Sequence, residues 1–258
     1  MTPPIDTVLF DLNETLLTQI RDEPSHIAYT YAAVTRQCWQ LTYPEFARAW
    51  EQVMADWDAH FSAGVAMLLA GQVEAARAHL VEPWYRDNIA RIFAQLGIAA
   101  PNRWIEQVTW QYQDSWVGGL RLPAGNLAAL EALRAAEFRL GLVTNFQQAN
   151  IIPEILAMHG LDAFLPPEYT VISSAFGTRK PHPAIFAQAL AQLGISGQPE
   201  RAAYVGDNPV DDVQGAALAG LRPIIIGGKP LLPEHQDVPR IQALSELPGL
   251  LARLNGAG

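Results

Sequence analysis

Polar side chains that could carry out chemistry follow the short apolar runs of this chain. They are Asp11, Asn13, Thr144, Asn145, Lys180, Asp207, Asp211 and Asp212. Carboxylates gathered at one place repel one another unless a cation lies among them, and their hard oxygen atoms suit Mg²⁺. The cation, a lysine, a hydroxyl and an amide would bind the oxygens of a phosphate group, while an aligned carboxylate attacks phosphorus. The set therefore indicates Mg²⁺-dependent chemistry on a phosphate through an aspartyl phosphate.

The elements that must position these residues are short and nearly continuously apolar, which is the pattern of parallel strands covered on both faces. The predicted strands are residues 7–10, 139–145, 169–174, 202–207 and 222–227. Helical patterns fill the gaps between them, and this alternation predicts an α/β fold with a parallel sheet. Ligands of such sheets bind beyond the carboxyl ends of the strands. The polar residues that close the strands are therefore expected to converge.

The segment of residues 20–117 has a different pattern, because it reads as one helix after another and holds every tryptophan of the chain. Apolar side chains recur every three or four positions in two stripes, which are Phe46, Trp50, Val53, Trp57 and Phe61, and Ile105, Val108, Tyr112 and Trp116. Such stripes predict helices whose apolar faces form a core of their own. Asn102 is expected to cap the helix of the second stripe. We interpret residues 20–117 as an all-helical insert.

Four motifs occur in order along the chain, namely "FDLNETL", "LVTN", "RKPHP" and "VGDNPVDDVQGAALAGL". Together they resemble the four motifs of the haloacid dehalogenase (HAD) superfamily of hydrolases. The resemblance implies a Rossmann-like three-layer α/β core with a parallel sheet, formed by residues 1–19 and 118–258. It also implies that residues 20–117 form a helical cap domain inserted between the first two motifs.

The resemblance implies roles for the acidic residues. Asp11 would be the nucleophile and also a ligand of Mg²⁺, with the backbone carbonyl of Asn13 as another ligand. Asp207 would complete the metal site. Asp212 would not bind the metal itself but would position the residues that do. Asp211, one position earlier, is the weaker candidate for that supporting role.

The resemblance also implies how a phosphate would be held. Thr144 and Asn145 would bind the transferring phosphoryl group. Lys180 would neutralise both that group and the attacking carboxylate. The expected partner is therefore a small phosphorylated molecule.

Asn13 departs from the pattern of the family's phosphatases, which have an aspartate there to protonate the leaving oxygen and later to activate water. An amide does neither, because it does not titrate in the useful range. Three functions therefore stay open. The first is a slow or specialised Mg²⁺-dependent phosphatase. The second is a 2-haloacid dehalogenase, whose departing halide needs no acid, and the third is a catalytically weak protein that binds a phosphorylated metabolite.

Composition excludes other classes of protein. Among 258 residues, 17 Lys and Arg stand against 26 Asp and Glu, for a net charge of -9, which argues against a nucleic-acid partner. Cys38 is the one cysteine, and neither a signal peptide nor an apolar run of about 18 residues is evident. We therefore expect a cytoplasmic protein with no membrane partner, and the oligomeric state stays open. Arg21, His26 and Arg179 are expected at the surface.

Overall fold

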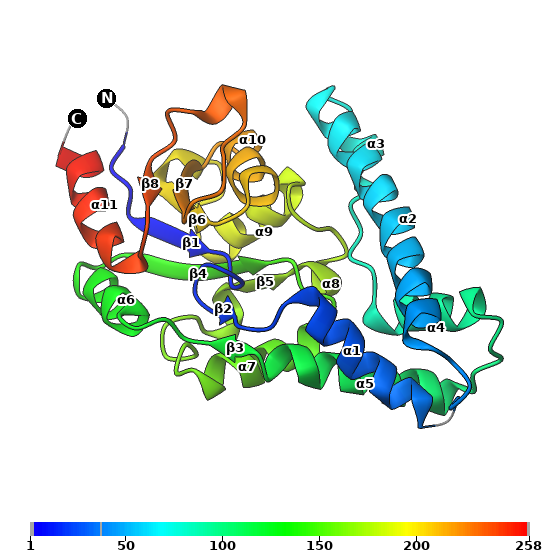
Figure 1. The fold of residues 1–258 in the computed structure, drawn as a ribbon. Helices are drawn as coiled ribbons and strands as arrows, with labels where there is room; N and C mark the ends of the chain where they lie inside the picture. The colour runs from blue at the N-terminus through cyan, green and yellow to red at the C-terminus, as the bar shows by residue number, and fades with distance from the viewer. Residues whose placement is uncertain (1–2, 37, 257–258) are drawn as a thin grey trace. The chain divides into compact units, whose positions relative to one another are not determined.

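The computed structural model describes residues 3–36 and 38–256 (Figure 1). They form two compact units. Within the described residues, one is an α/β unit of residues 3–18, 80–82 and 122–256, and the other is a helical unit of residues 19–36, 38–79 and 83–121. None of the helices in the described residues combines the length and apolar character that crossing a membrane requires.

One short segment of the insert belongs to the other unit. Leu80–Glu82 packs as part of the α/β unit, although the sequence places it deep within the helical insert. The predicted core consists of residues 1–19 and 118–258, and the predicted cap consists of residues 20–117. That these are two separable domains stays a prediction.

The α/β unit is built on a six-stranded sheet in the order β5-β4-β1-β6-β7-β8, and its neighbouring strands pair in parallel. The strands are β1 (Thr7–Phe10), β4 (Arg139–Thr144), β5 (Thr170–Ile172), β6 (Ala202–Gly206), β7 (Arg222–Ile226) and β8 (Arg240–Ile241). The predicted parallel α/β fold is confirmed, and each predicted strand overlaps an observed one. The run predicted as 169–174 ends early, because helix α8 (Ser173–Phe176) begins there.

Three strands of two residues were not predicted from the sequence. They are β8 and the two members of a separate small sheet, β2 (Thr18–Gln19) and β3 (Leu120–Arg121). A strand of two residues carries no measurable period, so pattern analysis has nothing to detect.

Strand β1 lies where the order of the strands reverses. β4 and β5 lie on one side of it, whereas β6, β7 and β8 lie on the other. Phe10, the last residue of β1, is paired with Leu142 of β4 and with Val205 of β6. Crossover connections diverge at such a point and leave a crevice in which ligands bind. The sheet therefore delivers the candidate residues after β1, β4 and β6 to one edge.

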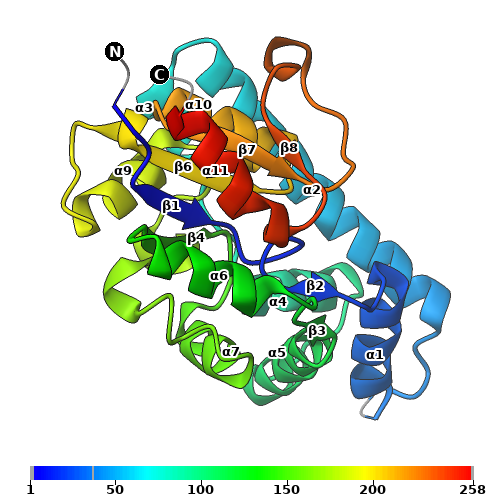
Figure 2. The ribbon, with the colours of Figure 1, turned by 90° about the vertical axis from the view of Figure 1, so that its left-hand side faces the viewer.

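Helices cover both faces of this sheet. Figure 1 and Figure 2 show α6 (Asn126–Ala135) and α11 (Leu247–Gly256) on one face, with α9 (Pro183–Gln192) and α10 (Gly215–Leu218) on the other. On the α9 face, the ring of Phe186 meets the ring of Tyr204 edge-on at 4.9 Å between centroids. These three layers match the predicted Rossmann-like core. The remaining short elements are α7 (Ile152–Met158), α8, the π-helical turn η4 (Pro209–Gln214), and the 3-10 turns η1 (Ala149–Ile151), η2 (Pro167–Tyr169), η3 (Pro199–Arg201), η5 (Pro233–His235) and η6 (Leu244–Glu246).

Among the residues that the structure describes, five helices make up the helical unit. They are α1 (Glu23–Thr35), α2 (Tyr43–Leu69), α3 (Val73–Arg77), α4 (Tyr85–Gln95) and α5 (Asn102–Val117). Asp22 accepts a hydrogen bond from the backbone N–H of Ser25 and so caps α1. At the start of α2, the carboxylate of Glu45 accepts a hydrogen bond of 2.9 Å from the backbone N–H of Thr42. These caps explain why the two helices begin where they do.

The predicted stripes supply much of the core of the helical unit. Its buried members from the two stripes are Phe46, Trp50, Val53, Ile105, Val108 and Tyr112. Trp57 and Phe61 lie further along α2 and stack on each other, with 5.4 Å between ring centroids. The predicted cap at Asn102 is wrong, because the extended residue before the helix is Pro101 and Asn102 is the first helical residue.

His26 contradicts its predicted place at the surface, since only 2% of it is exposed. Its Nδ1 lies 3.0 Å from the hydroxyl of Ser115, and the ring of Tyr112 meets it edge-on at 6.2 Å. Burial, helped by the charge of Arg21, lowers the pKa of His26 below its ordinary value. The folded helical unit therefore keeps this imidazole neutral.

Acidification is expected to weaken the protein through His26. Below about pH 6.5 the unfolded chain binds a proton at this residue that the folded chain does not, so the free energy of unfolding falls as the pH falls. The slope for this one group is at most about 1.4 kcal/mol per pH unit. Thermal unfolding between pH 7.5 and 5.5 should show a larger loss for the unaltered protein than for His26→Gln. Equal losses in the two proteins would rule out His26 as the source.

Candidate active site

Asp11 and Lys180 meet at the carboxyl end of β1. The backbone N–H of Asp11 donates to the carbonyl of Val205 at 2.9 Å and so prolongs the strand pairing by one residue. Its Oδ1 lies 2.8 Å from Nζ of Lys180, which comes from the loop before α9. Nζ also lies 2.6 Å from Oδ1 of Asp212. Two segments far apart in sequence thus hold a carboxylate against an ammonium group.

Lys180 is built into the interior, with 2% of its surface exposed. Its Nζ donates to the hydroxyl of Tyr204 at 2.8 Å, and that hydroxyl donates to the carbonyl of Val143 at 2.8 Å. Burial alone would favour the neutral amine, but Asp11 and Asp212 outweigh it and raise the pKa of Lys180. The lysine is therefore a fixed positive charge beside Asp11.

The surroundings of Asp11 disfavour the ionised form of its carboxyl group. Burial is the main cause that raises its pKa to about 7; Lys180 opposes the rise, and Asp212 and Asp207 add to it. Oxygen atoms of Asp11, Asp207 and Asp212 lie within 4.8 Å of one another. A hard divalent cation fits such a set of oxygen donors and would relieve their repulsion.

Asp212 differs from the other two carboxylates because both of its oxygens are occupied. Oδ1 faces Lys180, and Oδ2 accepts a hydrogen bond of 2.8 Å from the backbone N–H of Asn208. Its side chain also lies against Gly206, where an added Cβ would come within 2.3 Å of the carboxylate. Only glycine fits at that position. Asp212 thus orients Lys180, which leaves Asp11 and Asp207 as the carboxylates better suited to hold a cation.

Two polar side-chain atoms, one at the end of β4 and one in the loop after β1, are buried and unsatisfied. Oγ1 of Thr144 and Oδ1 of Asn13 make no hydrogen bond with any residue that the structure describes. Buried polar groups in folded proteins are nearly always paired. The hydroxyl at the end of β4 and the amide oxygen two residues after Asp11 are therefore open to a partner that the chain itself does not supply, either water or a ligand.

Asn145 follows β4, and its side chain bonds to two residues of the segments around it. Its Oδ1 accepts from the backbone N–H of Lys180 at 2.8 Å, and its Nδ2 donates to Asp211 at 3.1 Å. The side chain therefore fixes the loop that carries the lysine. Its predicted contact with a phosphoryl group stays a prediction.

Arg179 also contradicts its predicted place at the surface, because it is 8% exposed and lies between two acids. Its guanidinium nitrogens lie 3.5 Å from Glu82 and 3.3 Å from Asp211. Ser173 donates to Glu82 at 2.8 Å. Asp211 therefore belongs with Arg179, whereas Asp212 supports Lys180. Sequence reasoning missed Glu82, since nothing in a helical pattern marks one residue as a member of the α/β unit.

Lys229 is a second lysine at the acidic cluster. It lies in the loop after β7, and its Nζ contacts Oδ2 of Asp207. Sequence reasoning missed this residue. A signal was present, because a residue that follows β7 must lie near the end of its neighbour β6, where Asp207 stands.

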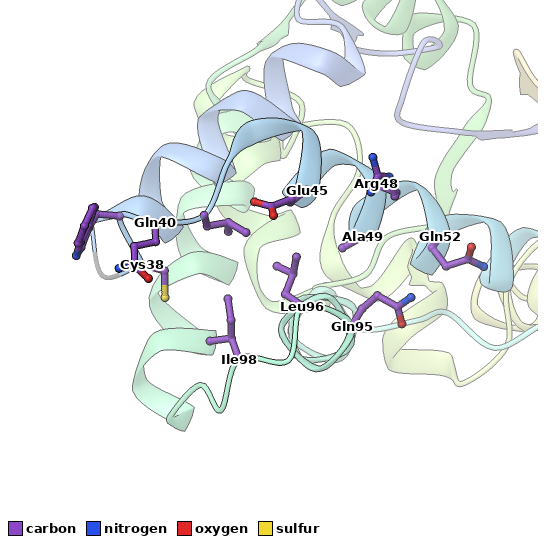
Figure 3. A pocket seen from close by; sticks show the side chains of 11 residues that line it. Cys38, Gln40, Glu45, Arg48, Ala49, Gln52, Gln95, Leu96 and Ile98 are labelled. Carbon is purple, nitrogen blue, oxygen red and sulfur yellow. The ribbon is translucent and has the colours of Figure 1, made fainter.

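A surface hollow of about 780 Å³ lies elsewhere, on the helical unit. Figure 3 shows side chains from the start of α2 and the end of α4 around it. Its charged lining residues are Glu45 and Arg48, and Glu45 is engaged in the capping of α2. The hollow offers no group of carboxylates and no nucleophile beside a base. The grouped carboxylates and the buried lysine lie instead at the edge of the sheet.

The sequence matches a family model. The model is described as a haloacid dehalogenase-like hydrolase and matches residues 5–220. That range contains the first three motifs, all but the last residue of the fourth, and the acidic cluster. The chain belongs to the haloacid dehalogenase-like hydrolase family, as its motifs predicted.

Curated relatives carry phosphatase names. Glyceraldehyde 3-phosphate phosphatase of Pyrococcus abyssi is 30% identical over 55% of this chain and 56% of that protein. Phosphoserine phosphatase of Thermus thermophilus is 36% identical over 46% of this chain and 47% of that protein. The chain thus spans about half the length of these relatives.

Solved structures share the fold over nearly the whole chain. The HAD-hydrolase YfnB from Bacillus subtilis, bound to magnesium, aligns with a TM-score of 0.60 at 20% identity, over 96% of this chain and 99% of that one. A 2-haloacid dehalogenase from Pseudomonas syringae aligns with a TM-score of 0.63 at 23% identity, over 97% and 99%. Because these identities are below 25%, the two alignments show a shared fold alone.

Proposed function

We propose that this chain is a Mg²⁺-dependent phosphatase that acts on a small phosphorylated metabolite through an aspartyl phosphate at Asp11. One observation carries the proposal. The carboxylate that ends β1 lies 2.8 Å from a buried lysine, within a group of three carboxylates. The phosphatase names of the relatives support the same reading.

The chemistry would run in two displacements. In the first, an oxygen of Asp11 bonds to phosphorus, and the bond from phosphorus to the leaving oxygen breaks with its electron pair on that oxygen. In the second, water attacks the phosphorus of the aspartyl phosphate, which releases inorganic phosphate and restores the carboxylate. Lys180 neutralises charge on Asp11 and on the phosphoryl oxygens, and the hydroxyl of Thr144 donates to one of those oxygens.

Asp11, Asp207 and the backbone carbonyl of Asn13 would hold the metal ion in this proposal. When bound, Mg²⁺ supplies positive charge that offsets the phosphoryl oxygens. Asp212 would act indirectly, through Lys180 and the N–H of Asn208, because neither of its oxygens is open.

Asn13 limits the range of substrates. It has no proton to give to a leaving alkoxide and no basic group to activate water. Acyl and aryl phosphates depart as weakly basic anions and need no such proton. We therefore expect them to be turned over faster than alkyl phosphates such as phosphoserine.

A turnover screen tests the proposal. The purified protein would be given acetyl phosphate, an aryl phosphate, phosphoserine, glyceraldehyde 3-phosphate and 2-chloropropionate, each with Mg²⁺ and each with excess chelator. Release of phosphate that needs Mg²⁺ and disappears in Asp207→Asn is the expected result. Glu154→Gln, an exposed change in the same unit, is the control and should leave turnover unchanged.

The other outcomes point to the alternatives. Chloride release that persists in chelator would identify the dehalogenase, in which Asn13 is no handicap because halide leaves without a proton. Binding of phosphorylated compounds with no turnover of any substrate would identify the binding protein. Either result would overturn the phosphatase.

A further inference from the structure

The two lysines at the acidic cluster differ in how they are held. Lys180 is 2% exposed and is enclosed by Asp11, Asp212 and Tyr204. The side chain of Lys229 is 53% exposed and meets one carboxylate of the cluster, Asp207. Lys180 is therefore part of the interior, whereas Lys229 reaches the cluster from solvent.

We propose that Lys229 is a displaceable counter-ion of Asp207, which holds this carboxylate in the metal-free protein and leaves it when a divalent cation binds. The inference rests on the metal site of the proposed function. In this role, Lys229 lowers the affinity of the protein for the divalent cation.

The balance of charge supports this assignment. When all of them are ionised, the carboxylates of Asp11, Asp207 and Asp212 and the ammonium groups of Lys180 and Lys229 carry one net negative charge together. A divalent cation in place of Lys229 brings the net charge to zero. A divalent cation together with Lys229 would leave one excess positive charge, and the two cations would repel each other across one carboxylate.

The loop of Lys229 is built so that the side chain alone must move. Nη2 of Arg240 donates to the carbonyl of Lys229 at 2.8 Å, and Nη1 of the same residue donates to the carbonyl of Gly227. Gly227 has a φ of +84°, a left-handed conformation that glycine adopts without strain. The backbone is thus tied to Arg240, while the long lysine side chain is free to swing into water.

The burial of Asp207 explains why a counter-ion is useful there. Asp207 is 8% exposed, and burial, together with the nearby charge of Asp212, raises its pKa while Lys229 opposes the rise. A buried carboxylate with no partner is costly. Lys229 supplies that partner from the solvent side, and a divalent cation that takes its place would leave Asp207 still paired.

Calorimetric titration of Mg²⁺ into the metal-free protein, with no substrate present, tests the proposal. Lys229→Met keeps most of the side-chain volume but removes the charge, and we expect it to bind Mg²⁺ about three to ten times more tightly. Lys229→Arg keeps the charge and should bind as the unaltered protein does. Arg222→Met is the matched control, since Arg222 begins the same strand β7 at its opposite end.

A second measurement keeps the test independent of affinity. In chelator, Lys229→Met should unfold at a lower temperature than the unaltered protein, because Asp207 has lost its partner. Saturating Mg²⁺ should remove that difference. A merely structural lysine would lower the unfolding temperature equally in both conditions.

Each remaining outcome is decisive. Binding of equal or lower affinity in Lys229→Met would overturn the role of Lys229 and leave the proposed function intact. The same gain in Arg222→Met would also overturn it, by showing a general effect of charge. Failure of every protein to bind Mg²⁺ would overturn the metal site of the proposed function itself.

Discussion

Asp11→Asn is expected to reduce phosphate release to the level of a blank while it stabilises the metal-free protein. The amide cannot attack phosphorus, so the loss of turnover should be about 10⁴-fold or more. The gain in stability follows from the surroundings of Asp11, where burial and two neighbouring carboxylates disfavour its charge and raise its pKa. Replacing a disfavoured charge by a neutral group of the same shape should raise the free energy of unfolding by about 1–3 kcal/mol at pH 8.

Two assays check this pair of effects. Steady-state phosphate release measures the first, and chemical unfolding in chelator measures the second. Asp162→Asn, a change of the same kind at an exposed position of the α/β unit, is the control and should alter neither quantity. Turnover that survives in Asp11→Asn would mean that another residue is the nucleophile. A loss of stability would mean that the ion pair with Lys180 outweighs the burial of Asp11.

The loss of turnover and the gain in stability expected for Asp11→Asn both follow from the position of this residue at the end of a central strand. β1 has buried neighbours on both sides, so the first residue beyond it is buried as well. A side chain placed there is held firmly but is poorly solvated. Lys180, with its pKa raised by two carboxylates, is the compensation that lets Asp11 stay at that position.

The strands that build the site could be predicted from the sequence because their signal is local. Residues 7–10 form β1 as predicted, and the run at 202–207 differs from β6 by one residue. The rule that ligands bind beyond parallel strands then predicts that Asp11 and Asp207 lie together. Their distances could not be predicted, because these depend on the order of the strands.

Contacts between distant segments were the part that sequence reasoning missed. Arg179 looks like a surface charge until Glu82, almost a hundred positions earlier, is found beside it. Lys229 follows β7, which was predicted as residues 222–227, but its contact with Asp207 also requires the pairing of β7 with β6. Single charged residues carry no period, so only the assembled fold shows which opposite charge each one meets.

Asn13→Asp is expected to raise the turnover of alkyl phosphates by as much as about 10²–10⁴-fold, which is the usual contribution of general acid–base catalysis. An aspartate at this position would place a buried carboxyl group two residues from the carboxylate of Asp11, and burial favours the protonated form of a carboxyl group. It could then donate a proton to the leaving oxygen and, once ionised, accept one from the attacking water.

The effect should depend on the leaving group. An alkoxide leaves poorly without a proton, so phosphoserine should gain most from Asn13→Asp. An acyl phosphate departs unaided, so the first displacement on acetyl phosphate should change little. In the unaltered protein the aspartyl phosphate also waits for unassisted water, and the first turnover should appear as a burst equal to the enzyme concentration. Asn13→Asp should abolish that burst.

Rapid-mixing measurements on phosphoserine and acetyl phosphate, with Asn13→Gln as the matched control, decide the matter. Gln keeps an amide at position 13 and should leave both substrates slow in the second displacement. If Asn13→Asp gives no gain on phosphoserine and the burst persists, a different residue moves the proton or the reaction is not phosphate transfer. A gain in the first displacement on phosphoserine alone, with loss of the burst on both substrates, would instead trace both expected slow steps to the amide at position 13, whose oxygen makes no hydrogen bond with the residues described here.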